Sequence, residues 1–127
     1  MRYHGRVDPR QVRGARAERL AARALETAGL RVVERNVRLT GGEIDLVCRG
    51  GDVWVFVEVK ARRTGWDDAP AAAVSWGKRR RIVRLAQQYL KWRGLRDVRC
   101  RFDVVEVTDD GRGDAVVRHL RSAFDAG

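Results

Sequence analysis

Cysteine, histidine and long hydrophobic runs are scarce in this 127-residue sequence, and each scarcity excludes a class of protein. The two cysteines, Cys48 and Cys100, form no C-x-x-C motif, and the histidines are not paired, which excludes the common structural zinc sites. Both cysteines lie in apolar runs, so we expect reduced thiols in the core. No apolar run approaches the ~20 residues of a membrane span, and no signal-peptide pattern is present. We therefore expect a cytoplasmic protein.

Lysine is scarce as well, because arginine supplies 24 of the 27 basic residues. With 17 acidic residues, the formal net charge is +10. A strongly basic domain favours a polyanionic partner, and the planar guanidinium group matches phosphate oxygens. High-GC codon bias explains the choice of arginine over lysine better than it explains the excess of basic residues. We therefore expect nucleic acid as the partner rather than a membrane surface.

Length and a hydrophobic content of 44% predict a single folded domain over residues 1–127, with a flexible N-terminus at about residues 1–8. Apolar residues at helical spacing predict two helices, one from Pro9 to Gly29 and one from Ser75 to Gly94. Apolar runs bounded by turn residues predict five strands, at residues 31–39, 43–49, 53–62, 98–108 and 115–120. The order αβββαββ predicts an α/β fold in which helices flank a mixed β-sheet.

The second and third strands are expected to form a hairpin around Gly50-Gly51. That turn would place Glu43 opposite Glu58, Ile44 opposite Val57 and Asp45 opposite Phe56. One face of the hairpin would then be entirely apolar: Ile44, Leu46, Cys48, Val53, Val55, Val57 and Val59. The other face would carry Glu43, Asp45, Val47, Trp54, Phe56, Glu58 and Lys60.

Three carboxylates and one lysine would gather at one end of this second face. Carboxylates this close repel one another, so the site would favour a bound cation or a proton. Hard oxygen ligands select Mg²⁺ or Mn²⁺ over zinc. Lys60 could face a substrate phosphate, and the whole set would suit metal-assisted phosphodiester hydrolysis. The alternative is a solvated strand end whose acids pair with nearby arginines.

The segment GGEIDLV followed by VFVEVKAR resembles the core of PD-(D/E)XK nucleases, whose fold is restriction-endonuclease-like. Over roughly residues 13–124, the chain resembles the YraN-like family of bacterial endonucleases, distant relatives of archaeal Holliday-junction resolvases. The resemblance implies that Asp45, Glu58 and Glu18 bind Mg²⁺ or Mn²⁺ and that Lys60 is catalytic. Glu43 also belongs to the pattern, either as a metal ligand or as a residue that orients a neighbour. Kinship with resolvases implies a homodimer.

Basic residues crowd the start of the second predicted helix: Lys78, Arg79, Arg80, Arg81 and Arg84. Positive charge there opposes the helix dipole, which makes sense if phosphates bind at this end; the alternative is a solvated basic face. Arg62 and Arg63, just past the lysine, are further candidates for phosphate contacts. Trp66 and Trp76 could stack on exposed bases.

The sequence thus predicts a divalent-metal-dependent endonuclease that acts on DNA, including branched or junction DNA. Two alternatives stay open: a nucleic-acid-binding module of the same fold that does not cleave, and an RNA-directed nuclease. Trp54 and Phe56 are expected in the core, and Arg101 and Asp103 are expected to support the sheet rather than to act in catalysis.

Overall fold

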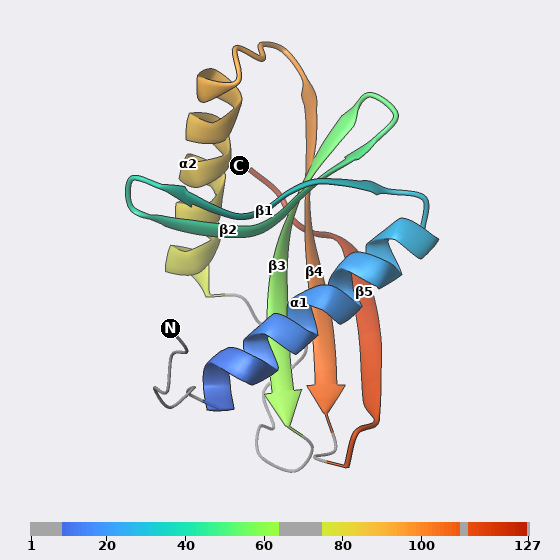
Figure 1. Cartoon of the computed structure of the whole chain (residues 1–127). Helices are drawn as coiled ribbons and strands as arrows, with labels where there is room; N and C mark the ends of the chain where they lie inside the picture. Colours follow the sequence, from blue (N-terminus) through green and yellow to red (C-terminus); the bar gives the residue numbers. More distant parts are fainter. Residues whose placement is uncertain (1–8, 64–74, 110–111, 127) are drawn as a thin grey trace, which may run out of the picture.

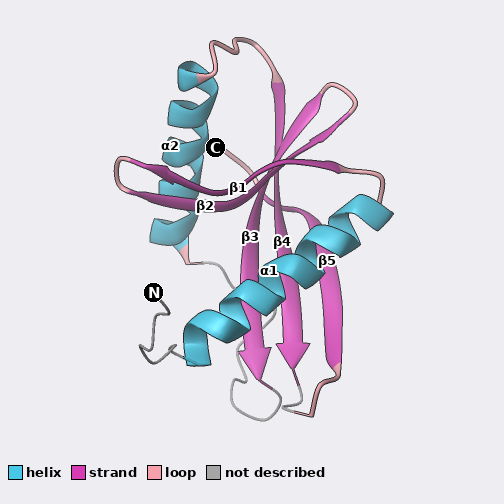
Figure 2. Ribbon diagram, in the orientation of Figure 1, coloured by secondary structure: helices cyan, strands magenta, loops and turns pink. Residues whose placement is uncertain are grey.

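The computed structural model describes residues 9–63, 75–109 and 112–126. Its elements follow the predicted order, αβββαββ, and five strands form one mixed sheet in the order β1-β2-β3-β4-β5 (Figures 1 and 2). The elements are α1 (Pro9–Thr27), β1 (Arg31–Leu39), β2 (Gly42–Gly50), β3 (Val53–Arg63), α2 (Trp76–Trp92), β4 (Arg99–Asp109) and β5 (Ala115–Phe124). The expected α/β fold is confirmed, and its architecture is compatible with a restriction-endonuclease-like core.

Strand direction follows from the connections between the strands. Short turns join β1 to β2 and β2 to β3, and these pairs are antiparallel, as is the pair of β4 and β5. The longer segment containing α2 joins β3 to β4, which are parallel, as a crossover connection requires. The expected loop over residues 64–73 and the expected N-terminal flexibility fall outside the described residues.

Both helices end where the sequence predicts, at glycines with positive φ angles. Gly29 follows α1 with φ +92°, and Gly94 follows α2 with φ +71°. In each case the next residue donates its backbone N–H back into the last turn, from Leu30 to the Leu25 carbonyl and from Leu95 to the Leu90 carbonyl. Glycine adopts this left-handed conformation without the steric cost of a Cβ. At its other end, α2 is capped by Ser75, whose Oγ accepts from the Lys78 N–H at 3.2 Å.

The helices cover opposite faces of the sheet, so the protein has two apolar cores. On one face, α1 packs through Ala17, Ala21, Ala22 and Leu25 against Leu46, Cys48, Val55, Val57, Val105 and Val107. On the other face, α2 packs through Ile82, Leu85, Ala86 and Tyr89 against residues that include Val47, Trp54, Phe56, Phe102 and Val104. Trp54 and Phe56 are buried beneath a helix, as predicted.

The predicted register of the β2–β3 hairpin is wrong by two residues. Gly50 pairs with Val53, so the turn consists of Gly51 and Asp52, and Leu46 rather than Ile44 lies opposite Val57. A slip of two residues does not by itself move a side chain to the other face of the sheet, so the apolar pattern gave no warning of it. Its consequence is that Asp45 moves from the level of Phe56 toward that of Glu58.

One residue of the predicted apolar face lies on the wrong side. Ile44 packs in the α2 core, whereas Leu46 packs in the α1 core. The alternation therefore breaks at Asp45, and pairing of β2 with β3 begins just after it, at Leu46. Figure 1 shows the β1–β2 hairpin bending away from β3 toward α2. Asp45 lies at the point where the two strands diverge.

The last strand is longer than predicted and carries a bulge. β5 extends to Phe124, and its register against β4 shifts between Phe102 and Val104. Ser122, which has a φ angle of 49°, donates its backbone N–H to Asp103 at 3.0 Å. Asp103 thus anchors the bulge, in agreement with its expected structural role. The expectation for Cys100 is wrong: it lies exposed near the start of β4, whereas Cys48 is buried.

Candidate metal centre

Asp45 occupies the centre of the candidate site because of the strand divergence. Beyond the Leu46–Val57 pair, β2 no longer supplies a partner to β3, and the Asp45 side chain takes that place. Its Oδ2 accepts the Val59 N–H at 2.8 Å. The carboxylate is therefore held against β3 by a backbone hydrogen bond, which fixes its position relative to Glu58, the residue before Val59.

Carboxylates from a helix and a strand meet at this point. Side-chain oxygens of Glu18 on α1 and of Glu43 and Asp45 on β2 all lie within 4.8 Å of one another. Two oxygens bound to one Mg²⁺ ion at about 2.1 Å can be at most about 4.2 Å apart. The three side chains would therefore have to move closer together to share one ion. The structure thus brings Glu18, Glu43 and Asp45 together, whereas Glu58, a predicted ligand, is not part of this group.

The protonation of Asp45 reflects its surroundings. Its pKa is raised to about 7, chiefly because burial disfavours the charged form. The neighbouring Glu58 and Glu18 carboxylates raise the pKa as well, and the hydrogen bond from Val59 opposes them. Repulsion and poor solvation thus keep this carboxyl group partly protonated at neutral pH. A cation between the acids would relieve both.

Glu58 is close enough to Asp45 to raise its pKa, but its own carboxylate has a cationic partner. Its side chain, which is 11% exposed, forms an ion pair with the Lys78 ammonium group at the start of α2. Sequence reasoning assigned Lys78 to phosphate binding and missed this contact, because the two residues meet only through the packing of α2 on the sheet. Lys60 lies two residues beyond Glu58 on β3 and is partly buried.

The predicted phosphate-binding residues fall into two groups. Arg62 has a side chain that is 10% exposed, and its Nε lies 3.4 Å from Glu106 Oε2 on β4. The Arg62 guanidinium group is thus largely shielded from solvent and paired with β4, and its predicted phosphate contact stays a prediction. Sequence reasoning missed Glu106, although it lies on β4 opposite Lys60. The side chain of Arg63 lies outside the described part of the structure.

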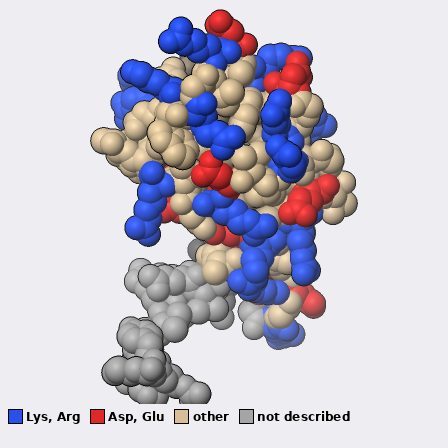
Figure 3. Space-filling model, turned by 45° about the horizontal axis from the view of Figure 1, so that its top comes forward, with Lys and Arg blue, Asp and Glu red and all other residues tan. Residues whose placement is uncertain are grey.

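The arginines of α2 are more accessible. Arg80, Arg81 and Arg84 are exposed, and Arg79 is partly buried, with its guanidinium group 5.7 Å from the centre of the Phe124 ring. On the face shown in Figure 3, Lys and Arg side chains surround small separate groups of acidic residues. The positive charge is thus distributed over this face, with the acids set among the basic residues.

The residues present fit a hard divalent cation. Glu18, Glu43 and Asp45 offer carboxylate oxygens, the donors that Mg²⁺ and Mn²⁺ prefer. Cysteine and histidine, which favour zinc, are absent from this group. Glu43 also lies 3.6 Å from Arg38 Nε, so its carboxylate is shared with a neighbouring strand.

Among the described residues, no helix is long and apolar enough to cross a membrane.

Comparisons with known proteins agree with the resemblance seen in the sequence. Residues 17–107 match the uncharacterised protein family UPF0102, the YraN family, and the chain belongs to this family. A UPF0102 protein of Dechloromonas aromatica is 50% identical over 118 residues, which cover 93% of this chain and 95% of the relative. One from Symbiobacterium thermophilum is 45% identical over 113 residues, covering 89% of this chain and 96% of the relative.

One solved structure is similar at a lower level. It is described as Pyrococcus furiosus SfsA in complex with Ca²⁺, is 14% identical and has a TM-score of 0.45. The match covers 88% of this chain and 63% of that chain. A likeness this weak carries no argument about the site.

Proposed function

We propose that this protein is a divalent-metal-dependent endonuclease that hydrolyses phosphodiester bonds in DNA, with branched or junction DNA as its substrate. The observation that supports this proposal is the cluster of Glu18, Glu43 and Asp45, with Glu58 near enough to help raise the pKa of Asp45 to about 7. A fold gains little from crowding four acids that repel one another. Such an arrangement is useful where a cation and a phosphate are to be held together.

In this proposal, Asp45, Glu18 and Glu58 hold Mg²⁺ or Mn²⁺, with Glu43 beside them. When bound, the ion supplies Lewis acidity toward the phosphate and lowers the pKa of a bound water. The Lys60 ammonium group donates hydrogen bonds to the scissile phosphate as negative charge develops on it. The exposed Arg80, Arg81 and Arg84 bind neighbouring phosphates, which position the backbone without reading base sequence.

The test is cleavage of labelled four-way junction, flap, linear duplex and single-stranded DNA with Mg²⁺ or Mn²⁺. Glu58→Gln and Asp45→Asn remove a charge at nearly constant shape, and we expect each to reduce cleavage by about 100-fold or more. Glu26→Gln is the matched control, because Glu26 is an exposed acid of α1 that faces Arg35. Cleavage that survives both site substitutions would contradict the assignment.

One observation favours the alternative, a binding module that does not cleave. The Lys78 ammonium group neutralises Glu58, a proposed metal ligand, which is expected of a site that binds no cation. Tight, salt-sensitive binding of DNA with no cleavage in either metal would support this module. Phosphate charge is common to DNA and RNA, so binding through it does not separate the two polymers. Cleavage of RNA versions of the same substrates would identify an RNA-directed nuclease.

A further inference from the structure

A pocket at the start of α2 remains without a role. It has a volume of about 540 Å³ and lies between the first turns of α2 and the C-terminal end of the chain. Its lining includes Trp76, Arg79, Arg80, Val83, Arg84 and Asp125. Sites for small organic groups have volumes of about 300–1,000 Å³, so a nucleotide is within reach of its size.

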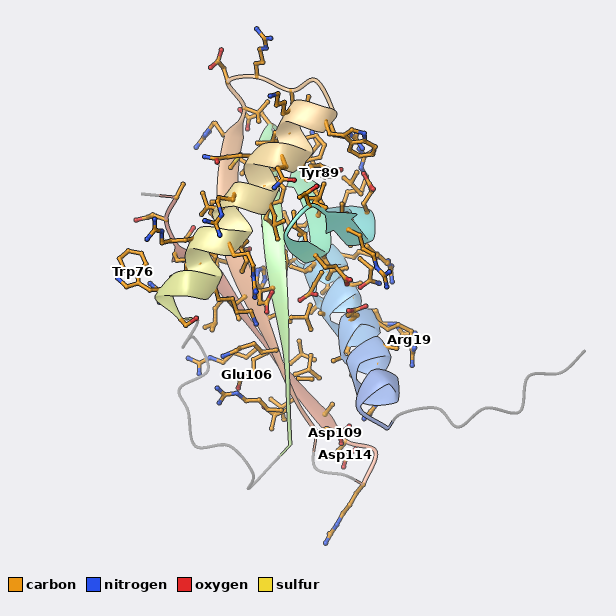
Figure 4. The ribbon with its side chains drawn as sticks, turned by 90° about the vertical axis from the view of Figure 1, so that its left-hand side faces the viewer. Arg19, Trp76, Tyr89, Glu106, Asp109 and Asp114 are labelled. Atoms are coloured by element: carbon orange, nitrogen blue, oxygen red, sulfur yellow. The ribbon has the colours of Figure 1, made fainter. Side chains whose placement is uncertain are left out.

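The pocket combines an exposed indole with positive charge. Trp76 is 70% exposed, whereas Trp54 in the core is 3% exposed. In Figure 4, Trp76 projects from the start of α2 away from the sheet, while Tyr89 lies on the side of α2 that faces the strands. An aromatic face in water next to arginines is the combination that binds unpaired nucleotides, because bases stack on the ring and phosphates bind the guanidinium groups.

Charge supports an anionic ligand. Three arginines line the pocket against one acid, Asp125. The Arg79 guanidinium group is held over the Phe124 ring, at 5.7 Å from its centre. The packing of Phe124 on Phe102, with ring centres 5.1 Å apart, links that ring to the core. The pocket wall is therefore partly preorganised, which lowers the entropic cost of binding.

The other exposed tryptophan has a different environment. Trp92, at the opposite end of α2, is 68% exposed, and its ring centre lies 6.0 Å from that of Tyr89. It borders a hollow with Arg38, Leu39, Thr40, Gln88 and Lys91, which has no cluster of arginines. Similar exposure on the same helix, beside one arginine instead of three, makes Trp92 a matched control for Trp76.

We propose that the Trp76 pocket binds an unpaired nucleotide of a nucleic acid, with its base on the indole and its phosphates on Arg79, Arg80 and Arg84. This inference rests on the proposed function and deepens it. Lys78, which pairs with Glu58 of the metal centre, lies in the same turn of α2 as Trp76. If the strand that binds in the pocket is also the strand that is cut, the substrate is DNA with a single-stranded segment near the cut.

Binding without metal tests the pocket separately from cleavage. The affinity of a labelled oligothymidylate of about 12 nucleotides, and of a blunt duplex of equal length, is measured by fluorescence anisotropy in EDTA. We expect Trp76→Ala to weaken single-strand binding by about fivefold or more, and to change duplex binding by less than about twofold. Trp76→Phe should restore most of the loss, and Trp92→Ala should leave both affinities unchanged.

A Trp76→Ala variant that binds the single strand as tightly as the wild type overturns the inference. So does an equal loss on the duplex, or an equal loss in Trp92→Ala. An oligouridylate of equal length extends the assay: a loss on DNA and RNA alike supports a pocket for any unpaired nucleotide, and a loss on DNA alone supports a DNA pocket. Cleavage by Trp76→Ala at the wild-type rate on every substrate, with unchanged binding, would overturn the pocket and leave the nuclease proposal standing. Selective binding without any cleavage would do the reverse.

Discussion

Two aspartates of one sheet, Asp103 on β4 and Asp45 on β2, have opposite electrostatic fates. Burial raises the pKa of both, but the pKa of Asp103 is lowered overall, because Arg101, Ser122 and His119 all hydrogen-bond to it. Arg101 donates from two nitrogens at 2.9 Å, and His119 Nε2 lies 2.7 Å away. Asp45 has one backbone donor and acidic neighbours instead. The fold thus stabilises the charged form of Asp103, whereas the surroundings of Asp45 disfavour its charged form.

The largest effect expected from this comparison is on folding. Asp103 is fully buried, and Asp103→Ala would leave the Arg101 guanidinium group and the Ser122 N–H without their acceptor. Breaking a buried ion pair on one side costs about 3–5 kcal/mol. We expect the free energy of unfolding, measured by urea denaturation, to fall by that amount. A loss below about 1 kcal/mol would show that the hydrogen bonds of Asp103 contribute little to stability.

The next effect concerns the cation. A ligand that binds only the folded state stabilises it by about 2.7 kcal/mol at a concentration 100-fold above its dissociation constant. We expect Mn²⁺ to raise the melting temperature of the wild type, and to have little effect on Asp45→Asn. Equal stabilisation of both proteins would place the ion elsewhere. Glu26→Gln, which lies outside the site, should respond like the wild type.

A third effect depends on pH. Because folding raises the pKa of Asp45 to about 7, the folded state binds more protons than the unfolded state between about pH 4 and pH 7. This group therefore lowers stability as pH rises through that window. In EDTA, Asp45→Asn should be more stable than the wild type by about 1–2 kcal/mol near pH 8, with the difference vanishing near pH 4. Urea denaturation across this range measures it. A difference that is independent of pH would contradict the raised pKa.

The smallest effect tests the ammonium group that Lys78 contributes to the acidic site. Lys78 pairs with Glu58, so a divalent ion bound by Glu58 must displace its ammonium group. Removing this competitor in Lys78→Gln should tighten Mn²⁺ binding about two- to fivefold, because a partly exposed ion pair contributes about 1 kcal/mol or less. Isothermal titration in the absence of DNA measures the change. Weaker binding would mean that Lys78 supports the site rather than competes for it.

Local patterns predicted the elements of the fold well. The stripe from Ile82 to Tyr89 identified the buried face of α2, and glycines marked the ends of both helices. The hairpin register was missed because Gly50-Gly51 and Gly51-Asp52 are both good turns, and a slip of two residues leaves the apolar faces unchanged. The reversal at Ile44 was missed because it follows from the bend of β2 toward α2, which no local pattern records.

The site was predictable in part for the same reason. Asp45 and Glu43 share a strand, and their proximity follows from local spacing. The resemblance supplied Glu18, and the structure brings it to them. Partners from distant elements were missed, namely Glu106 for Arg62 and Glu58 for Lys78. Sequence reasoning assigned these basic residues to phosphate contacts, and only the packing of the elements shows that they pair with acids of the chain.

The hydrogen bond from the Val59 N–H to Asp45 offers a way to follow the state of the candidate site. At Val59, a backbone amide of β3 is protected by a side chain of the candidate site. Whatever draws the carboxylate oxygen away, whether a cation or a substitution, releases that amide to solvent. The exchange of a single proton with deuterium, followed at Val59 by nuclear magnetic resonance, therefore reads the state of the site without substrate and without turnover.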